Sequence, residues 1–254
     1  MNTTNTNKPA RGLALLGIAL AVGMIAAAFV LGSQFKNFRQ PGTITVKGLA
    51  EESHQADSAE WQTSVAAHGD TYAQTLARLQ AAEPVLAEFL QQHGFSGQEI
   101  RTLTPAVEPA YDEIRREDGS YQRVQNGFDG EQKLLVKTTN LANIQKAQQA
   151  ILQLRADNEA IRFEPPQYLL GNLEAVKHAL ITRATEDAHK RAQEFAKTGG
   201  AQVGAMRSAS QGSFNIYADS GDGGSDDYGG VYDKSTVGKN VRLVVTIEYG
   251  IDGK

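Results

Sequence analysis

The sequence predicts an α+β fold, in which about three helices pack on a mixed or antiparallel sheet, with one transmembrane helix ahead of them. Three observations predict it. Residues 12–32 form an uninterrupted apolar stretch. Residues 58–67 alternate between apolar and polar side chains, which is the period of a half-buried strand. Residues 172–197 repeat apolar side chains every three or four positions, which is the period of a helix.

The apolar stretch reads GLALLGIALAVGMIAAAFVLG. A helix that crosses the hydrocarbon core of a bilayer needs ~20 such residues, so we predict a membrane anchor over 12–32. Its representative residues are Gly12, Leu16, Val22, Phe29 and Leu31. A cleaved signal peptide is the alternative, because Ala26-Ala27-Ala28 resembles a small-residue cleavage site. The apolar run continues beyond these alanines, which favours the anchor.

Two basic residues flank the anchor on each side, Lys8 and Arg11 before it and Lys36 and Arg39 after it. The charge bias that orients a membrane helix is therefore nearly balanced. We expect a short cytoplasmic tail and an exported body. The tail spans 1–11, a polar linker spans 33–42, and the folded domain spans 43–254.

The folded domain begins with two predicted strands. Ile44 and Val46 alternate with polar residues after Thr43. In the second strand, one face carries Ala59, Trp61, Thr63, Val65 and Ala67. Between the strands, Glu51, Glu52 and His54 are expected in a solvated turn.

A helix follows over 71–93, with Asp70 as its predicted N-cap and Gly94 just after its end. Its apolar stripe is Tyr72, Leu76, Leu79, Leu86, Phe89 and Leu90. Pro84 lies inside the helix and lacks a backbone N–H. We therefore predict a kink or a break there.

The middle of the domain mixes strands with a polar excursion. We predict strands over 100–107 and 131–138. Between them, 109–130 is polar and rich in turn residues, which indicates an exposed excursion or a hairpin around Asn126-Gly127.

The second half contains the remaining helices. We predict a helix over 141–154, with Ile144, Ile151 and Leu154 facing inward, and an extended segment over 160–169 interrupted by Pro165-Pro166. The helix over 172–197 has the stripe Leu173, Val176, Leu180, Ala184, Ala188, Ala192 and Phe195.

The last segments are a strand over 203–212, a flexible loop over 213–238 and a closing strand. The closing strand places Val241, Leu243, Val245, Ile247 and Tyr249 on one face. The loop is rich in glycine, aspartate and serine.

Composition excludes several classes of function. The chain contains no cysteine, so it has no disulfide, thiolate nucleophile or cysteine-bound zinc. Its net charge is −4, and residues 1–40 contain no acidic side chain, so the folded domain is more acidic still. Such a surface repels phosphate backbones, and we expect no nucleic-acid partner.

Two clusters of charged residues can be compared with known kinds of site. The stretch from 44 to 62 contains an acid, a base and a cation, and raises the hypothesis of a catalytic cluster; its charged residues are Lys47, Glu51, Glu52, His54, Asp57 and Glu60. In the loop, Asp219, Asp222, Asp226 and Asp227 are a weak calcium candidate whose spacing matches no known calcium loop. We predict no catalytic residue, cofactor or metal ligand set, and no enzyme.

Several stretches together resemble the SIMPL-domain family. The resemblance runs over about 43–251 and rests on an ordered set of weak motifs. They are Val46, Gly48, Ala56 and Asp57; Pro166 and Tyr168; Ala184, Ala188, Arg191, Ala192, Ala196, Gly199, Gly204 and Gln211; and the closing VRLVVTIEYGI. Pro84 and the composition of the loop after Asp219 depart from the pattern.

The resemblance implies an exported bacterial envelope protein. Some members form ring-like or channel-like homo-oligomers, some are linked to oxidative or envelope stress, and the family has no agreed catalytic residues. We expect a single-pass protein of the inner membrane, with its C-terminal domain in the periplasm, that self-associates through 109–130, 213–238 and exposed strand edges. The alternative is a monomeric or low-order binding module for a lipid, a peptidoglycan fragment or an envelope protein, with a pocket between helices and sheet.

Overall fold

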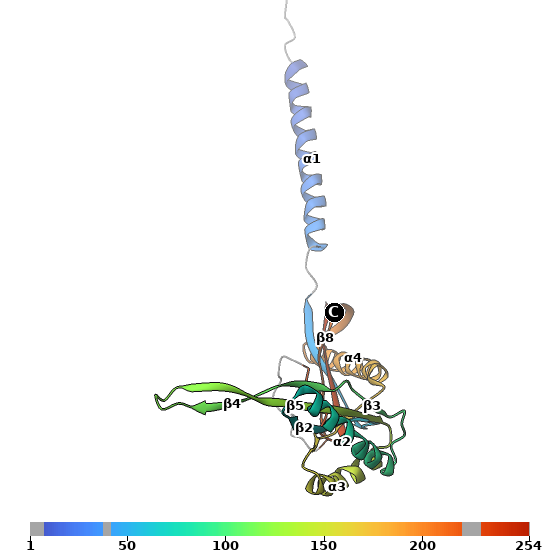
Figure 1. Cartoon of the computed structure of the whole chain (residues 1–254). Coiled ribbons are helices and arrows are strands. Elements are labelled where there is room, and N and C mark those ends of the chain that lie inside the picture. Colours follow the sequence, from blue (N-terminus) through green and yellow to red (C-terminus); the bar gives the residue numbers. More distant parts are fainter. Residues whose placement is uncertain (1–7, 38–41, 220–229, 254) are drawn as a thin grey trace, which may run out of the picture. The chain divides into compact units, whose positions relative to one another are not determined.

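A computed structural model describes residues 8–37, 42–219 and 230–253, and within the first helix the side chains of 17–32 (Figure 1). The helices are α1 (Lys8–Asn37), α2 (Tyr72–Gln92), α3 (Leu141–Asp157) and α4 (Leu173–Thr198). The strands are β1 (Thr43–Gln55), β2 (Ser58–Gly69), β3 (Ile100–Thr102), β4 (Ala106–Arg115), β5 (Tyr121–Thr138), β6 (Ile161–Phe163), β7 (Gln167–Leu169), β8 (Ala201–Ala218) and β9 (Gly238–Gly253). The predicted α+β class is confirmed, with antiparallel sheets and four helices in the described part of the chain.

The chain folds as two compact units. The smaller contains Met1–Val46, Lys190–Ala209 and Ile247–Lys254, and the larger contains Lys47–His189 and Ser210–Thr246. The predicted anchor lies within α1, where the described side chains of Val22, Phe29 and Leu31 are exposed. Among the residues that the structure describes, no helix reaches the length and apolar character needed to cross a membrane.

One sheet has the strand order β3-β5-β2-β6, with β4 also paired to β5 and β7 to β2. Every one of these pairings is antiparallel. The alternation predicted for β2 is confirmed, because Ala59, Trp61, Thr63 and Val65 are buried. Trp61 and Val65 pack with side chains of α2 and α3, so these two helices cover one face of the sheet.

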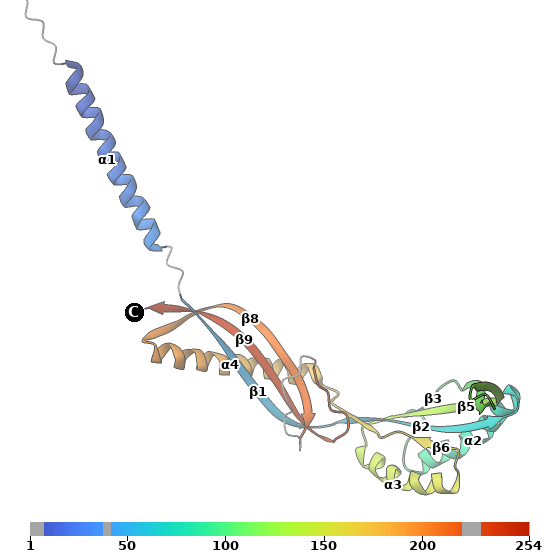
Figure 2. The same ribbon diagram turned by 90° about the vertical axis from the view of Figure 1, so that its left-hand side faces the viewer.

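The second sheet has the order β1-β9-β8, and Figure 2 shows these strands side by side. The predicted inward face of β9 is confirmed from Val241 to Tyr249. In the larger unit, Gly48 of β1 lies directly against the backbone of α4 at Ala184 and Ala188. Both alanines are fully buried, so this contact brings a helix and a strand unusually close together.

The turn predicted at Glu51, Glu52 and His54 is wrong, because β1 continues to Gln55. Exposure still alternates here, with residues 50, 52 and 54 less exposed than their neighbours. The charged side chains remain in the strand because partners offset their charges: Arg183 lies beside Glu52, and Arg242 of β9 lies beside Glu51.

The N-cap predicted for α2 is wrong. Thr71 caps the helix instead of Asp70, since its side-chain oxygen accepts a hydrogen bond from the Gln74 N–H at 3.2 Å. Of the kink or break predicted at Pro84, the structure excludes the break, because α2 continues through the proline, and the kink stays a prediction. Buried Leu79 and Leu86 anchor the helix on either side of the proline, and this packing outweighs one lost backbone hydrogen bond.

The strand predicted over 100–107 is two strands, β3 and β4, which pair with different parts of β5. The predicted hairpin exists, but its turn lies at 116–120, where the Arg116 N–H donates to the Ser120 carbonyl at 2.8 Å. Gly127 lies within β5, near an irregularity in the pairing with β4. Its φ of +73° and a Gly69 oxygen 2.4 Å from where a Cβ would stand explain the glycine there.

One further boundary and two burial predictions differ. The first part of the predicted loop is strand, because β8 continues to Ala218 with Asn215 and Ile216 buried. Phe195 was predicted to face inward but is 62% exposed, and Ala196 is buried in its place. Tyr72 is also exposed, at the first turn of α2.

Candidate functional site

The charged cluster of the opening stretch does not converge on one point. Glu51 and Glu52 are adjacent in β1, so their side chains point to opposite faces of the sheet. Glu52 accepts a hydrogen bond from Arg183 at 2.9 Å, whereas Glu51 lies 3.3 Å from the Arg242 Nε. His54 lies 3.8 Å from Glu52, too far for a hydrogen bond. The structure therefore gives no nucleophile, base and acid in contact here.

Asp57 has a structural role. Its carboxylate accepts hydrogen bonds from the Gly171 N–H, at 2.7 and 3.0 Å, and its own N–H donates to the Leu169 carbonyl at 3.0 Å. The preceding Ala56 N–H donates to the Val237 carbonyl at 2.8 Å. The Ala56-Asp57 pair thus ties the junction of β1 and β2 to two distant segments of the larger unit.

Sequence reasoning missed the ion pair of Lys239 and Asp233. The Lys239 side chain is fully buried, and its ammonium donates to an Asp233 carboxylate oxygen at 2.9 Å and to the Asp233 carbonyl at 2.6 Å. Burial raises the pKa of Asp233, but hydrogen bonds from Ser235, Thr236 and Lys239 outweigh it and hold the pKa well below its ordinary value. The pair fixes the start of β9 and leaves no free group for chemistry.

The loop aspartates form no visible metal site. Asp219 accepts a hydrogen bond from the Ser53 hydroxyl at 3.4 Å. Asp222, Asp226 and Asp227 lie outside the described residues. Across the described ranges, no group of three or more histidine, aspartate and glutamate side chains is arranged to hold a metal ion.

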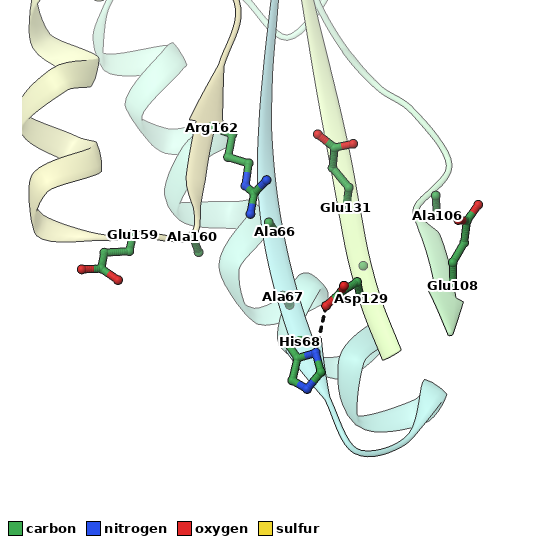
Figure 3. A pocket seen from close by; sticks show the side chains of 11 residues that line it. Ala66, Ala67, His68, Ala106, Glu108, Asp129, Glu131, Glu159, Ala160 and Arg162 are labelled. Carbon is green, nitrogen blue, oxygen red and sulfur yellow. Dashed lines mark hydrogen bonds and ion pairs between the residues drawn. The ribbon is translucent and has the colours of Figure 1, made fainter. Parts of the chain in front are cut away.

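A hollow of about 740 Å³ lies at one end of the β2–β5 sheet (Figure 3). Small residues form its floor, among them Ala66, Ala106, Gly130 and Ala160. Its charged and polar lining is His68, Glu108, Asp129, Glu131, Glu159 and Arg162. The lining carries four carboxylates and one guanidinium, so we name it the acidic hollow.

The acidic hollow lies on the open face of the sheet. Ala66 and His68 alternate with Val65 along β2, so they point away from the core that α2 and α3 cover. The teal helix, α2, is accordingly seen behind the strands in Figure 3. The predicted pocket lies between helices and sheet. Between this sheet and helices α2 and α3, buried side chains such as Trp61 and Leu134 fill the space. A smaller hollow of about 480 Å³ is lined by the end of α4 and the start of β8.

Some charges in the hollow are paired and others are not. His68 Nδ1 lies 2.8 Å from an Asp129 carboxylate oxygen. Glu131 accepts a hydrogen bond from Ser64 at 2.7 Å. Within the described residues, the side chains of Glu108, Glu159 and Arg162 make no hydrogen bond or ion pair. The hollow therefore has unpaired carboxylates on two sides, from β4 and from the segment before β6.

The second distinctive feature is the outer part of the β4–β5 hairpin, residues 109–128, which we name the arm. It begins where β2 ends, since Gly69 pairs with Phe128. Beyond this point β5 pairs only with β4, so the arm is a two-stranded ribbon (Figure 1). Its exposed large apolar side chains are Tyr111, Ile114, Tyr121 and Val124, with exposed fractions between 38% and 67%.

The arm exposes apolar side chains on both faces. Tyr111 and Tyr121 share one face of the arm. Tyr121 pairs directly with Arg115, and Arg115 is on the same face of β4 as Tyr111, which lies four residues before it. Ile114 and Val124 lie on the other. The Arg123 guanidinium stacks over the Tyr111 ring, 4.6 Å from its centre. Neither face has the packed apolar layer that normally stabilises a hairpin.

Comparison with known proteins identifies a family for most of the chain. A model of the SIMPL family, described as "Protein of unknown function (DUF541)", matches residues 44–247. The match contains Gly48, Asp57 and the whole arm. A search of curated proteins returned no match to this chain.

Proposed function

We propose that this chain, which belongs to the SIMPL family, is a non-enzymatic, membrane-anchored protein of the bacterial envelope that self-associates through its arm. The observation that carries the proposal is the arm itself. A lone two-stranded ribbon is marginally stable in water, because it buries little apolar surface. The arm would be stabilised if a partner covered its exposed apolar side chains, which are Tyr111, Ile114, Tyr121 and Val124.

The free edges of the arm support the same proposal. In the arm, where β5 runs from Tyr121 to Phe128, the edge of β5 that faces away from β4 has no strand partner in the described chain beyond the Gly69–Phe128 pair. The edge of β4 that faces away from β5 has none either. Unpaired N–H and C=O groups of an edge strand are ready to pair with another chain. Tyrosine and arginine, which the arm carries at several positions, are enriched at protein–protein contacts.

The anchor is the second part of the proposal, and its support is the sequence. The uncharged stretch 12–32 has the length that a bilayer-spanning helix requires. Apolar side chains such as Phe29 point outward from α1 with no covering partner among the described residues. The bacterial inner membrane, the periplasmic side and the link to envelope stress stay predictions from the family resemblance.

Self-association is tested with the full chain in detergent, by analytical ultracentrifugation at micromolar concentration. We expect an oligomer. A variant that replaces Tyr111, Ile114, Tyr121 and Val124 by serine is expected to be monomeric with unchanged far-ultraviolet circular dichroism. The matched control replaces Leu152 and Val85, which are 61% and 44% exposed on α3 and α2, and should associate like the wild type. A monomeric wild type contradicts the proposal.

Anchoring is tested separately, by alkaline extraction of membranes from cells that express the full chain. The wild type should stay in the membrane pellet, because 12–32 provides the apolar length. Val22→Lys with Phe29→Lys should release the chain, since a charged side chain at the bilayer centre costs about 2.5–3.5 kcal/mol. Complete extraction of the wild type would refute the anchor.

A further inference from the structure

We propose that the acidic hollow on the open sheet face of one copy receives the arginine tip of the arm of a second copy. The inference rests on the proposed self-association and specifies its contact. Two features make the tip a suitable occupant: it carries two adjacent arginines, Arg115 and Arg116, and it lies at the far end of a ribbon whose base carries the hollow. The turn also contains Glu117 and Asp118, and the Asp118 carboxylate accepts hydrogen bonds from the Ser120 N–H and hydroxyl within the turn.

The tip of the arm presents two neighbouring guanidinium groups. Arg115 ends β4 and Arg116 begins the turn. The Arg116 guanidinium donates two hydrogen bonds to the Gln122 side-chain oxygen, at 3.0 and 2.8 Å, which holds the group at the surface of the turn. Arg115 makes no side-chain hydrogen bond or ion pair among the described residues. It remains available for a carboxylate, the partner that guanidinium binds with two hydrogen bonds.

The hollow offers the complementary charge. Glu108 projects from one side and Glu159 from the other, as Figure 3 shows, and both lack a partner in the described chain. Asp129 and Glu131 add two more carboxylates between them. The floor of alanine and glycine leaves room for a side chain to enter, and its volume falls in the ~300–1,000 Å³ range of ligand pockets.

The tip of a chain cannot occupy the hollow of the same chain. Glu108 and Arg115 are seven residues apart in β4, and at about 3.4 Å per residue they are roughly 24 Å apart. A second copy satisfies the geometry directly. When two arms lie side by side and antiparallel, the tip of each arrives at the base of the other. That arrangement has two-fold symmetry, so both contacts form at once.

Tyr111 then lies near the centre of the paired arms, about midway between Glu108 and Arg115 in β4. Aromatic side chains at the centre of an interface supply much of its binding energy, while charges at its ends fix orientation and suppress other pairings. The arm would thus supply the apolar contact, and the tip and the hollow would set the antiparallel direction.

Charge reversal tests the pairing in the full chain. Arg115→Glu with Arg116→Glu reverses the tip, and Glu108→Arg with Glu159→Arg reverses the hollow. We expect each double variant to weaken association at least about tenfold, because like charges then face each other. All four changes in one chain should restore it, and so should an equimolar mixture of the two double variants. Lys146→Glu, an exposed reversal on α3, is the control and should change nothing.

The readout is sedimentation at low and high salt, with circular dichroism to confirm folding. If a charge-reversal variant fails to fold, a neutral double variant replaces it in the test. The neutral variants are Arg115→Gln with Arg116→Gln, and Glu108→Gln with Glu159→Gln. Each should weaken association and reduce the salt dependence of association. An associating wild type that neither reversal weakens overturns the inference and leaves self-association standing. Two weakened variants without rescue also overturn it. A monomeric wild type overturns the proposed function itself.

Discussion

Substituting Gly48 by alanine should destabilise the fold far more than the small added volume suggests. A Cβ at this position would stand 2.0 Å from the Ala184 carbonyl oxygen, 2.7 Å from the Ala188 nitrogen and 2.8 Å from the Ala188 Cβ. All three obstacles belong to α4, and two are backbone atoms. No side-chain rotation can relieve the clash, so helix and strand must separate.

The size of that separation gives the magnitude. Reaching an acceptable contact of about 3 Å from 2.0 Å requires a shift of about 1 Å. Leu180, Ala184 and Ala188 are fully buried on the same stripe, and a gap of that size forfeits a quarter to a half of each packing contact. Overpacking of this kind lowers the free energy of unfolding by about 3 kcal/mol. Alanine raises it by ~0.4–1 kcal/mol, because it reduces the conformational entropy of the unfolded chain. We expect a net loss of about 2–3 kcal/mol.

The assay is urea unfolding of the full chain, followed by Trp61 fluorescence and circular dichroism. Trp61 is the sole tryptophan and is fully buried in the same unit as Gly48. Gly97→Ala is the matched control: its Cβ would meet nothing within 4 Å, and its φ is not positive. The control should match or exceed wild-type stability. If Gly48→Ala lost less than about 1 kcal/mol, the close approach of β1 and α4 would be wrong.

Two further predictions concern polar contacts. Asp57→Ala should lower the free energy of unfolding by about 1–2 kcal/mol, because the Gly171 N–H loses its acceptor, and Asp57→Asn should lose less; equal losses in urea unfolding would contradict this role. The pKa of Asp233 is lower in the folded chain than its ordinary value of 3.8, so its contribution to stability is present above that pH and is lost as the pH falls through the folded pKa. Unfolding free energy should therefore fall between pH 5 and pH 3, and at pH 7 Asp233→Asn should cost about 3–5 kcal/mol by leaving buried Lys239 without its carboxylate. Unchanged stability of this variant at pH 7 would contradict the buried pair.

The sequence predicted elements well where one face is buried. β2 and β9 each bury alternate residues, and α4 buries Leu180, Ala184 and Ala188 at helical spacing, so the hydrophobic pattern reports the packing directly. The arm has no such pattern, since it is exposed on both faces. Its strands could not be predicted from burial, and the turn was assigned to Asn126-Gly127 on turn propensity alone.

The candidate site was harder to predict than the fold. Residues adjacent in a strand point to opposite faces, which is why Glu51 and Glu52 do not form a site although they are neighbours in sequence. Glu108, Asp129 and Glu159 come from three separate segments, and only the pairing of β4, β5 and β2 brings them to one hollow. That register depends on the whole sheet, so no local spacing could have indicated it.

Several residues that carry the family resemblance serve the fold. Gly48 permits the approach of α4, Asp57 holds the Gly171 segment, and Ala184 and Ala188 complete the packed stripe. Such residues identify the architecture and are occupied by structural contacts, so they are poorly placed to bind a partner as well. Among the described residues, Glu108 and Glu159 in the hollow and Arg115 at the tip of the arm make no side-chain hydrogen bond or ion pair. We therefore expect function to involve exposed charges of this kind, because they are accessible and free to pair with a partner.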